Sequence, residues 1–375
     1  AMTDTTSGEE NTSVGFSSLG NNTTGASNTA VGRSALAANT TGTNNVAIGK
    51  SAALAATTST GNVVIGQEAV KTGVFTGFNN VVIGKLAGED LTSADANVII
   101  GEDAGKNQTT ADNNVLIGQG AGEATTTGAL NTVIGQGAYA SSTVGNRSVA
   151  LGVQAMGTGV NTGQKNIAIG YQAGKPITSG VRNIIIGDEA GHSITTAGTN
   201  TIIGTEAGRS IVTTGDNTIV GNEAGKLNTT TLTAFGAFAG HDHVDGYSNT
   251  FIGRYAGREV TNGHSSTAVG NAALLTATTA VTNTAVGSNS LRLTTTGADN
   301  TAVGHESLDN NTTGYSNTAL GGNALLHNTT GHNNTAIGRL SMGVGTVTGP
   351  YNTAIGRLSL QDITSGTKNQ MMGAS

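Results

Sequence analysis

One glycine recurs through the chain at an almost fixed spacing. Each copy closes a segment of the form N-T-A-[IV]-G, and twenty-one such glycines run from Gly15 to Gly356. Of the twenty intervals between them, sixteen are 17 residues, three are 18 and one is 15. A period this short has no room for a β-α-β crossover, so each copy must stack directly on the next. The spacing predicts an all-β chain, a parallel β-roll or β-solenoid of about 21 coils of 17 residues.

The columns of the aligned repeat have restricted compositions. Two flanking columns lie one and three residues before the glycine. The column one residue before it is apolar, and the column three residues before it is Thr, Val or Ile. The small column, three residues after the glycine, is always Ala or Ser. Side chains alternate between the two faces of a strand, and β-branching favours extended backbone. We therefore expect two short strands per coil, with the flanking and small columns inside the coil.

An asparagine column lies four residues before the glycine. Asn stands there in eighteen of the twenty-one copies, and the exceptions are Ser148, Leu232 and Ser266. Asparagines stacked at a bend can hydrogen-bond to their neighbours in the coils above and below, and Asn tolerates left-handed backbone. The column predicts an asparagine-capped turn in each coil.

The middle column, two residues before the glycine, points away from the flanking columns. It is apolar in every copy except the one with Ser13. Nine copies have Leu or Met four residues after the glycine, and in all nine the middle residue is small. Nine other copies have Gly at that position, and in seven of these the middle residue is large. This volume compensation is typical of close packing. We predict that a seam between chains of a symmetric oligomer is lined by Val82, Ile99, Leu116, Ile185, Ile202, Ile219 and Phe251.

Composition excludes several function classes. The chain has no Cys, a formal charge of −6 and only 3% aromatic residues, which argues against thiolate chemistry, nucleic-acid binding and a roomy globular core. It has no apolar run long enough to insert in a membrane. The carboxylates of Glu206 and Glu223 alternate with the cations of Arg209 and Lys226, which indicates a surface charge ladder. We expect a chain that is not an enzyme and uses no cofactor.

One local cluster has metal-ligand character. His241-Asp242-His243 follows the single 15-residue interval, and Asp245 lies nearby. Three copies of a H-x-H pair around an axis can offer six imidazoles to one transition metal. His241 and His243 are therefore metal-ligand candidates, and the alternative is a solvated loop.

The repeat N-T-A-I-G-x-x-A-L closely resembles the N-S-V-A-I-G-x-x-S head repeat of YadA-like trimeric autotransporter adhesins. It is even more similar to the N-T-A-I-G-x-x-A-L-x-x-N-T-T-G arrays of phage tail fibres and bacterial surface fibres, including the mosaic trimeric fibres of predatory bacteria. The resemblance covers residues 11 to about 360. It implies a left-handed roll, a homotrimer with two further copies of the chain, and attachment to a cell surface.

Three segments follow from this organisation. Residues 1–10 form a lead-in whose Ala1-Met2 start is typical of a cloning remnant, residues 11–360 form the continuous array, and residues 361–375 form a tail in which the repeat fades. Because the chaperones of such tail fibres cut themselves off after a serine, the resemblance also implies a self-cleavage end at Ser375. The alternative is an arbitrary boundary.

The function that we expect is a structural and adhesive fibre. Such a fibre projects from a virion tail or a bacterial surface and attaches to a glycan or protein receptor on a host or prey cell, with multivalent contacts. The receptor-binding residues are not identified by the repeat. Two alternatives remain: an ice-binding β-solenoid, which is disfavoured by an inward-facing threonine column, and a polysaccharide-degrading tailspike.

Overall fold

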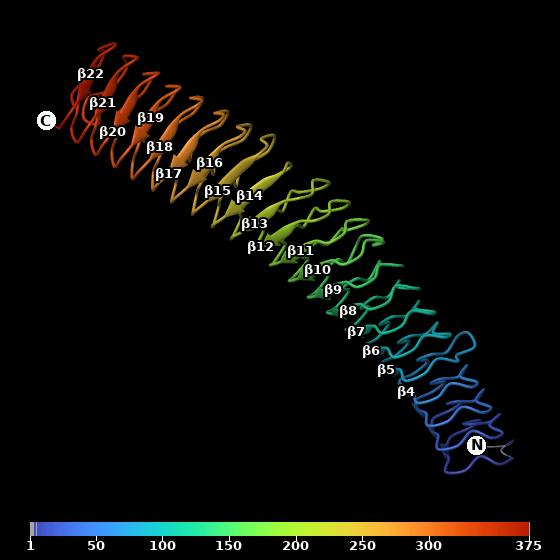
Figure 1. Ribbon diagram of the computed structural model, residues 1–375. Coiled ribbons are helices and arrows are strands. Elements are labelled where there is room, and N and C mark those ends of the chain that lie inside the picture. Colours follow the sequence, from blue (N-terminus) through green and yellow to red (C-terminus); the bar gives the residue numbers. More distant parts are fainter. Residues whose placement is uncertain (1–3, 5, 375) are drawn as a thin grey trace. The chain divides into compact units, whose positions relative to one another are not determined.

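The computed structural model describes residue 4 and residues 6–374. Across these residues the chain consists of short strands, turns and bends, and it contains no helix. It forms two compact units, residues 1–189 with 193–196 and residues 190–192 with 197–375. Within each unit, successive coils stack with one strand in each coil (Figure 1). The all-β solenoid prediction is confirmed, with one named strand per coil and not two.

The strands are three or four residues long. Unit 1 contains β1 (Thr12–Val14), β2 (Thr29–Val31), β3 (Val46–Ile48), β4 (Val63–Ile65), β5 (Val81–Ile83), β6 (Val98–Ile100), β7 (Val115–Ile117), β8 (Thr132–Ile134), β9 (Val149–Leu151), β10 (Ile167–Ile169) and β11 (Ile184–Ile186). Unit 2 contains β12 (Thr201–Ile203), β13 (Thr218–Val220), β14 (Leu232–Phe235), β15 (Asn249–Ile252), β16 (Thr267–Val269), β17 (Thr284–Val286), β18 (Thr301–Val303), β19 (Thr318–Leu320), β20 (Thr335–Ile337), β21 (Thr353–Ile355) and β22 (Gln370–Met372).

The strand register follows the sequence period. In each unit every strand pairs in parallel with the next, usually 17 residues on, as Thr29 does with Val46. The register absorbs an 18-residue interval between Val63 and Val81 and the 15-residue interval between Thr218 and Thr233. Irregular coils therefore keep the strands aligned and change only the turns.

The repeat glycine ends each strand in a conformation that other residues rarely adopt. Its φ is positive in every coil, for example +133° at Gly32. A Cβ added to Gly32 would lie 2.5 Å from the carbonyl oxygen of Gly49 in the next coil. Glycine is thus required at this position in every coil, both because φ is positive and because the backbone of the next coil approaches closely.

The array extends further than the sequence analysis predicted. β22 lies in residues 361–375, which were assigned to a tail, and it pairs with β21. Asn369 and Gly373 occupy the asparagine and glycine positions of this last coil, and Gly373 has φ +131°. The prediction that the repeat ends near residue 360 is wrong because Gln370, Met371 and Met372 replace the usual T-A-I without changing the backbone.

The asparagine column forms a buried hydrogen-bonded ladder. The backbone N–H of Asn45 donates to Oδ1 of Asn28 at 3.0 Å, and Nδ2 of Asn45 donates to the same oxygen at 3.1 Å. Oδ1 of Asn45 in turn accepts both bonds from Asn62, and its Nδ2 also donates to the carbonyl of Ser59 at 2.7 Å. The predicted stacking is confirmed. The left-handed residue, however, is the one before the asparagine, as at Asn44 (φ 57°).

The ladder decides which strand face is inside. Because side chains alternate along a strand, a residue two positions after an inward-facing asparagine also faces inward. The middle-column residue Ala30 is accordingly fully buried, while Thr29 and Val31 beside it are only half-buried. The expectation that the flanking columns line the interior is therefore wrong, and these columns face outward.

The predicted seam residues lie inside one chain and not between chains. All seven are fully buried in a single copy: Val82, Ile99, Leu116, Ile185, Ile202, Ile219 and Phe251. Their partners are the glycines four residues after the repeat glycine. A Cβ on Gly257 would lie 2.5 Å from the ring of Phe251, and one on Gly122 would lie 3.0 Å from Leu116. The volume compensation is real, but it fills the coil interior.

We expect Asn45→Ala to lower the free energy of unfolding by about 2–4 kcal/mol, because it leaves buried groups of Asn28, Asn62 and Ser59 unpaired. Urea denaturation measures this loss. Asn45→Ser should lose less, since the Ser266 hydroxyl already accepts the backbone N–H of Asn283 in an equivalent place. Asn44→Ala is the matched control, because Asn44 is exposed and its column holds Ala at residue 96. A loss in Asn44→Ala equal to that in Asn45→Ala would contradict the ladder.

A second prediction tests the interior packing through a double-mutant cycle. Leu116→Ala should cost about 2–5 kcal/mol by opening a cavity, and Gly122→Leu alone should cost about 1–3 kcal/mol by overpacking. The double variant should be more stable than the sum of the two losses, because coils such as the one with Ala30 and Leu36 carry this pairing. Purely additive losses in urea denaturation would show that the two positions do not share one space.

Candidate functional site

The outward strand face of unit 1 is aliphatic over five consecutive coils. In β3 to β7 both outward residues are Val or Ile, as with Val98 and Ile100 in β6. They are half-buried by their neighbours above and below, and Ile48 in β3 is 40% exposed. Aliphatic side chains aligned on one face are typical of an interaction surface. We call the outward residues of β3 to β7 the aliphatic face.

The same face has a different composition in unit 2. From β12 to β21 the first outward residue is Thr in all ten strands, and the second is Val, Ile, Leu or Phe. These threonines are half-buried, and they face outward. The expectation that the threonine column faces into the coil is therefore wrong, and an inward-facing column no longer disfavours ice binding.

The charged residues after the strands form ion pairs between coils. Nζ of Lys226 pairs with the carboxylates of both Glu206 and Glu223, and the hydrogen bonds to them raise the pKa of Lys226. The hydrogen bond from Lys226 lowers the pKa of Glu223, which also contacts Nε2 of His241 at 3.3 Å. This arrangement matches the predicted surface charge ladder, and it engages both carboxylates with cations.

The two candidate metal ligands lie in different environments. His243 is fully buried, and its Nδ1 and Nε2 are within 2.8 and 2.9 Å of the side chains of Asn228 and Asn249. His241 is partly buried, with Nδ1 2.6 Å from Oδ1 of Asp242. Within the described residues no group of three or more His, Cys, Asp or Glu side chains could hold a metal ion. Both imidazole nitrogens of His243 are therefore committed to the coil interior.

An aromatic and cationic cluster adjoins the charge ladder in unit 2. Phe238 and Tyr255 occupy the position two after the repeat glycine, where the preceding coil has Glu223, and their ring centroids are 5.3 Å apart. The guanidinium of Arg254 lies 4.3 Å from the Tyr255 centroid, and that of Arg258 lies 5.4 Å from it. We call Phe238, Tyr255, Arg254 and Arg258 the aromatic–arginine cluster.

The aromatic–arginine cluster was not among the predicted sites, although the sequence contains a signal for it. Five of the chain's twelve Phe and Tyr residues fall between residues 235 and 255, next to the one 15-residue interval. Concentration of a rare residue type at the most irregular coil marks a departure from the repeat. Aligning the repeats emphasises columns whose residue type is constant. A change from an acidic residue to an aromatic one within a single column, as from Glu223 to Phe238, is therefore easily missed.

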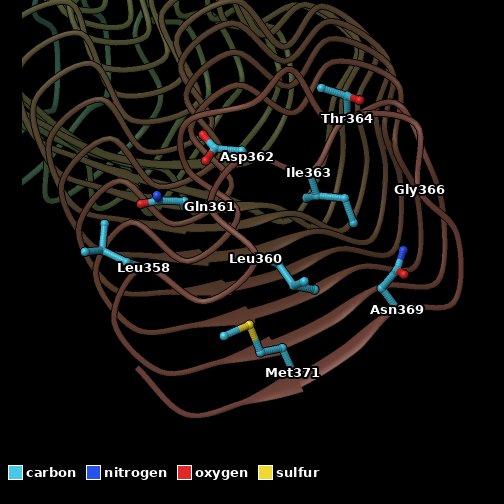
Figure 2. Close-up of a pocket in the computed structure, with 9 residues that line it drawn as sticks. All are labelled: Leu358, Leu360, Gln361, Asp362, Ile363, Thr364, Gly366, Asn369 and Met371. Atoms are coloured by element: carbon cyan, nitrogen blue, oxygen red, sulfur yellow. The ribbon is translucent and has the colours of Figure 1, made fainter. Parts of the chain in front are cut away.

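A hollow of about 590 Å³ lies at the last coil of unit 2 (Figure 2). Leu360, Ile363 and Met371 line it, and they belong to columns that are covered by the following coil elsewhere. Leu360 is only half-buried, whereas its equivalents Leu325 and Met342 are fully buried. The hollow is thus an uncovered cross-section of the coil interior. The predicted self-cleavage end at Ser375 lies outside the described residues.

Comparisons with known proteins give no independent family assignment. No protein-family model matches the chain, and no curated protein matches it either. No helix in the described part of the chain is long and apolar enough to cross a membrane. The surfaces described above are therefore the basis for any functional argument.

Burial of His243 predicts a pH-dependent stability. Desolvation lowers the pKa of His243 from 6.5 to about 4, so the unfolded chain binds a proton that the folded chain resists. The stabilisation is complete above pH 6.5 and is lost as the pH falls toward 4, by up to about 3 kcal/mol. Urea denaturation from pH 7 to pH 4 measures this loss.

His243→Asn is the matched variant, because Asn228, Asn311 and Asn328 occupy the same column of the coil. The two proteins contain the same carboxylates, so the difference between the two pH profiles reports on the imidazole. Identical profiles would mean that His243 is not buried in its neutral form.

Proposed function

We propose that this chain is a structural and adhesive fibre protein whose copies associate along their outward strand faces. The observation that carries the proposal is the aliphatic face of β3 to β7, in which ten outward residues are all Val or Ile. Water would meet these residues in a single copy, and their association with another apolar surface removes that contact.

A second copy of the chain is the partner that this face fits best. Its side chains repeat once per coil, about 4.8 Å apart, and only a surface with the same repeat can pack against every coil. At roughly 50 Å² per coil, the eleven strands of unit 1 and the eleven strands of unit 2 each offer about 550 Å² per copy, and the two contributions add up to the area of a specific interface. A closed symmetric assembly buries the face on every copy.

The resemblance to trimeric tail and surface fibres supports three copies and an extracellular setting. In this proposal the assembly projects from a virion tail or a bacterial surface, and it attaches to a receptor on a host or prey cell. Side surfaces that remain free, including the turns after the strands, are displayed in several copies. Multivalent display converts weak contacts into firm attachment.

Ice binding is a second candidate, favoured by the outward threonines of β12 to β21. Ten threonines at equivalent positions of a parallel sheet form a repetitive polar array. The two candidates exclude each other at this face, because a threonine buried between copies cannot contact ice. The aliphatic composition of the same face in unit 1 favours association.

Light scattering on a sizing column tests association directly. We expect a molar mass of about 111 kDa, three times the 37.0 kDa of one chain. A mass near 74 kDa would replace the trimer with a dimer. A 37 kDa monomer that shows thermal hysteresis would overturn the fibre proposal in favour of ice binding.

Substitutions on the aliphatic face test whether it is the contact surface. Ile100→Lys should shift the protein toward monomer at micromolar concentration, because it places a charge in an apolar interface. Val98→Thr should leave the mass unchanged, since Thr stands in that column throughout β12 to β21. Sedimentation velocity distinguishes the two variants. An unchanged assembly in Ile100→Lys would place the interface elsewhere.

A further inference from the structure

The aromatic–arginine cluster has cations that the protein itself does not neutralise. Among the described residues Arg254 and Arg258 form no ion pair, and neither does Glu259 beside them. The nearby acids Glu206 and Glu223 are already paired with Lys226. The cluster therefore carries positive charge on the surface of a chain whose formal charge is −6.

The arginine side chains are held in place by the rings. The Arg258 guanidinium lies 5.9 Å from the Phe238 centroid and 5.4 Å from the Tyr255 centroid, and its Nε is buried without a hydrogen-bond partner in the described structure. Arg254 donates from Nη2 to the Tyr255 hydroxyl at 2.8 Å. Contacts of Arg258 with two rings, and of Arg254 with the ring and hydroxyl of Tyr255, limit the rotamers of both arginines before any ligand arrives.

The backbone beneath the cluster is fixed by the coil. The N–H of Tyr255 donates to the carbonyl of Ala237 in the preceding coil at 3.0 Å. The N–H of Arg258 donates to the carbonyl of Tyr255 at 3.3 Å, and the carbonyl of Arg258 accepts the N–H of Asp242 at 2.8 Å. These bonds place the cluster on the turns that directly follow β14 and β15.

We propose that this cluster binds a carboxylate-bearing sugar of an acidic polysaccharide. Guanidinium groups recognise carboxylates with paired, charge-assisted hydrogen bonds, and the half-exposed rings of Phe238 and Tyr255 offer apolar surface to a sugar ring. The inference rests on the proposed adhesive function and names the receptor chemistry for it. One site per chain gives several sites per assembly, which suits a polymer with a repeating charge.

The test measures binding of the full-length protein to immobilised polygalacturonate by biolayer interferometry. Fully methyl-esterified polygalacturonate has the same sugar backbone without the carboxylates, and dextran sulfate has charge without the carboxylated sugar. We expect binding to polygalacturonate alone, weakened by salt. Arg254→Gln, Arg258→Gln and Tyr255→Leu should each weaken it by about tenfold or more.

The repeat supplies a matched control for Arg254→Gln and a precedent for Tyr255→Leu. Arg339 occupies the column of Arg254 but has Leu340 beside it instead of an aromatic ring, so Arg339→Gln should bind as the unaltered protein does. Leu340 and Leu358 occupy the column of Tyr255, so Tyr255→Leu is compatible with the fold. Circular dichroism and the molar mass of each variant verify folding and assembly.

Two outcomes would overturn the inference. One is no binding to polygalacturonate by a protein whose mass shows that it has assembled, which leaves the fibre proposal standing. The other is binding without specificity for the site. This would appear as equal binding to dextran sulfate and polygalacturonate, or as equal binding to polygalacturonate by Arg254→Gln and Arg339→Gln. Either result would mean diffuse charge attraction and not a defined site. A monomeric protein that binds as predicted would instead uphold the site and reject the fibre.

Discussion

The buried asparagine ladder is the interaction on which the rest of the structure depends. Asn45 shows the full pattern, because its carboxamide oxygen accepts from Asn62 in the next coil and its carboxamide nitrogen donates to Asn28 in the coil before. A polar side chain can lie in the interior only if its bonds are satisfied there, so the ladder needs every coil in register. Changes of coil length are therefore confined to the turns, as in the 15-residue coil that precedes β14.

The two faces of every strand follow from this constraint. The middle column shares the asparagine face and fills a narrow interior with Ala, Ile or Phe, matched by Gly or Leu across the coil. The flanking columns are left on the outside, where their β-branched side chains suit a sheet surface. The outer face is free to vary, and it does: β3 to β7 of unit 1 have Val where β12 to β21 of unit 2 have Thr. We interpret that variation as the place where association between copies is encoded.

Much of the fold was predictable, whereas the facing of the strands and the candidate site were not. The glycine period predicts the parallel solenoid because it leaves room for nothing else. The prediction of which strand residues face the interior was wrong because it followed the β-branched and apolar character of Thr29 and Val31. The position of Asn28, two residues before Ala30, already indicates that Ala30 faces inward. The aromatic–arginine cluster depends on contacts between adjacent coils, between Phe238 and Tyr255 for instance. In the aligned repeats, a contact that is specific to one pair of coils is visible only as a departure of a column from its consensus residue.

Hydrogen exchange of the asparagine side chains tests the central claim most directly. Selective ¹⁵N labelling of asparagine allows the carboxamide protons to be followed by NMR after transfer to D₂O. The account predicts slow exchange for ladder residues such as Asn97 and Asn300, which are at most 1% exposed, and exchange within the dead time for exposed Asn44. Equally fast exchange at all three would contradict a hydrogen-bonded ladder in the coil interior, and with it the assignment of the inner and outer faces.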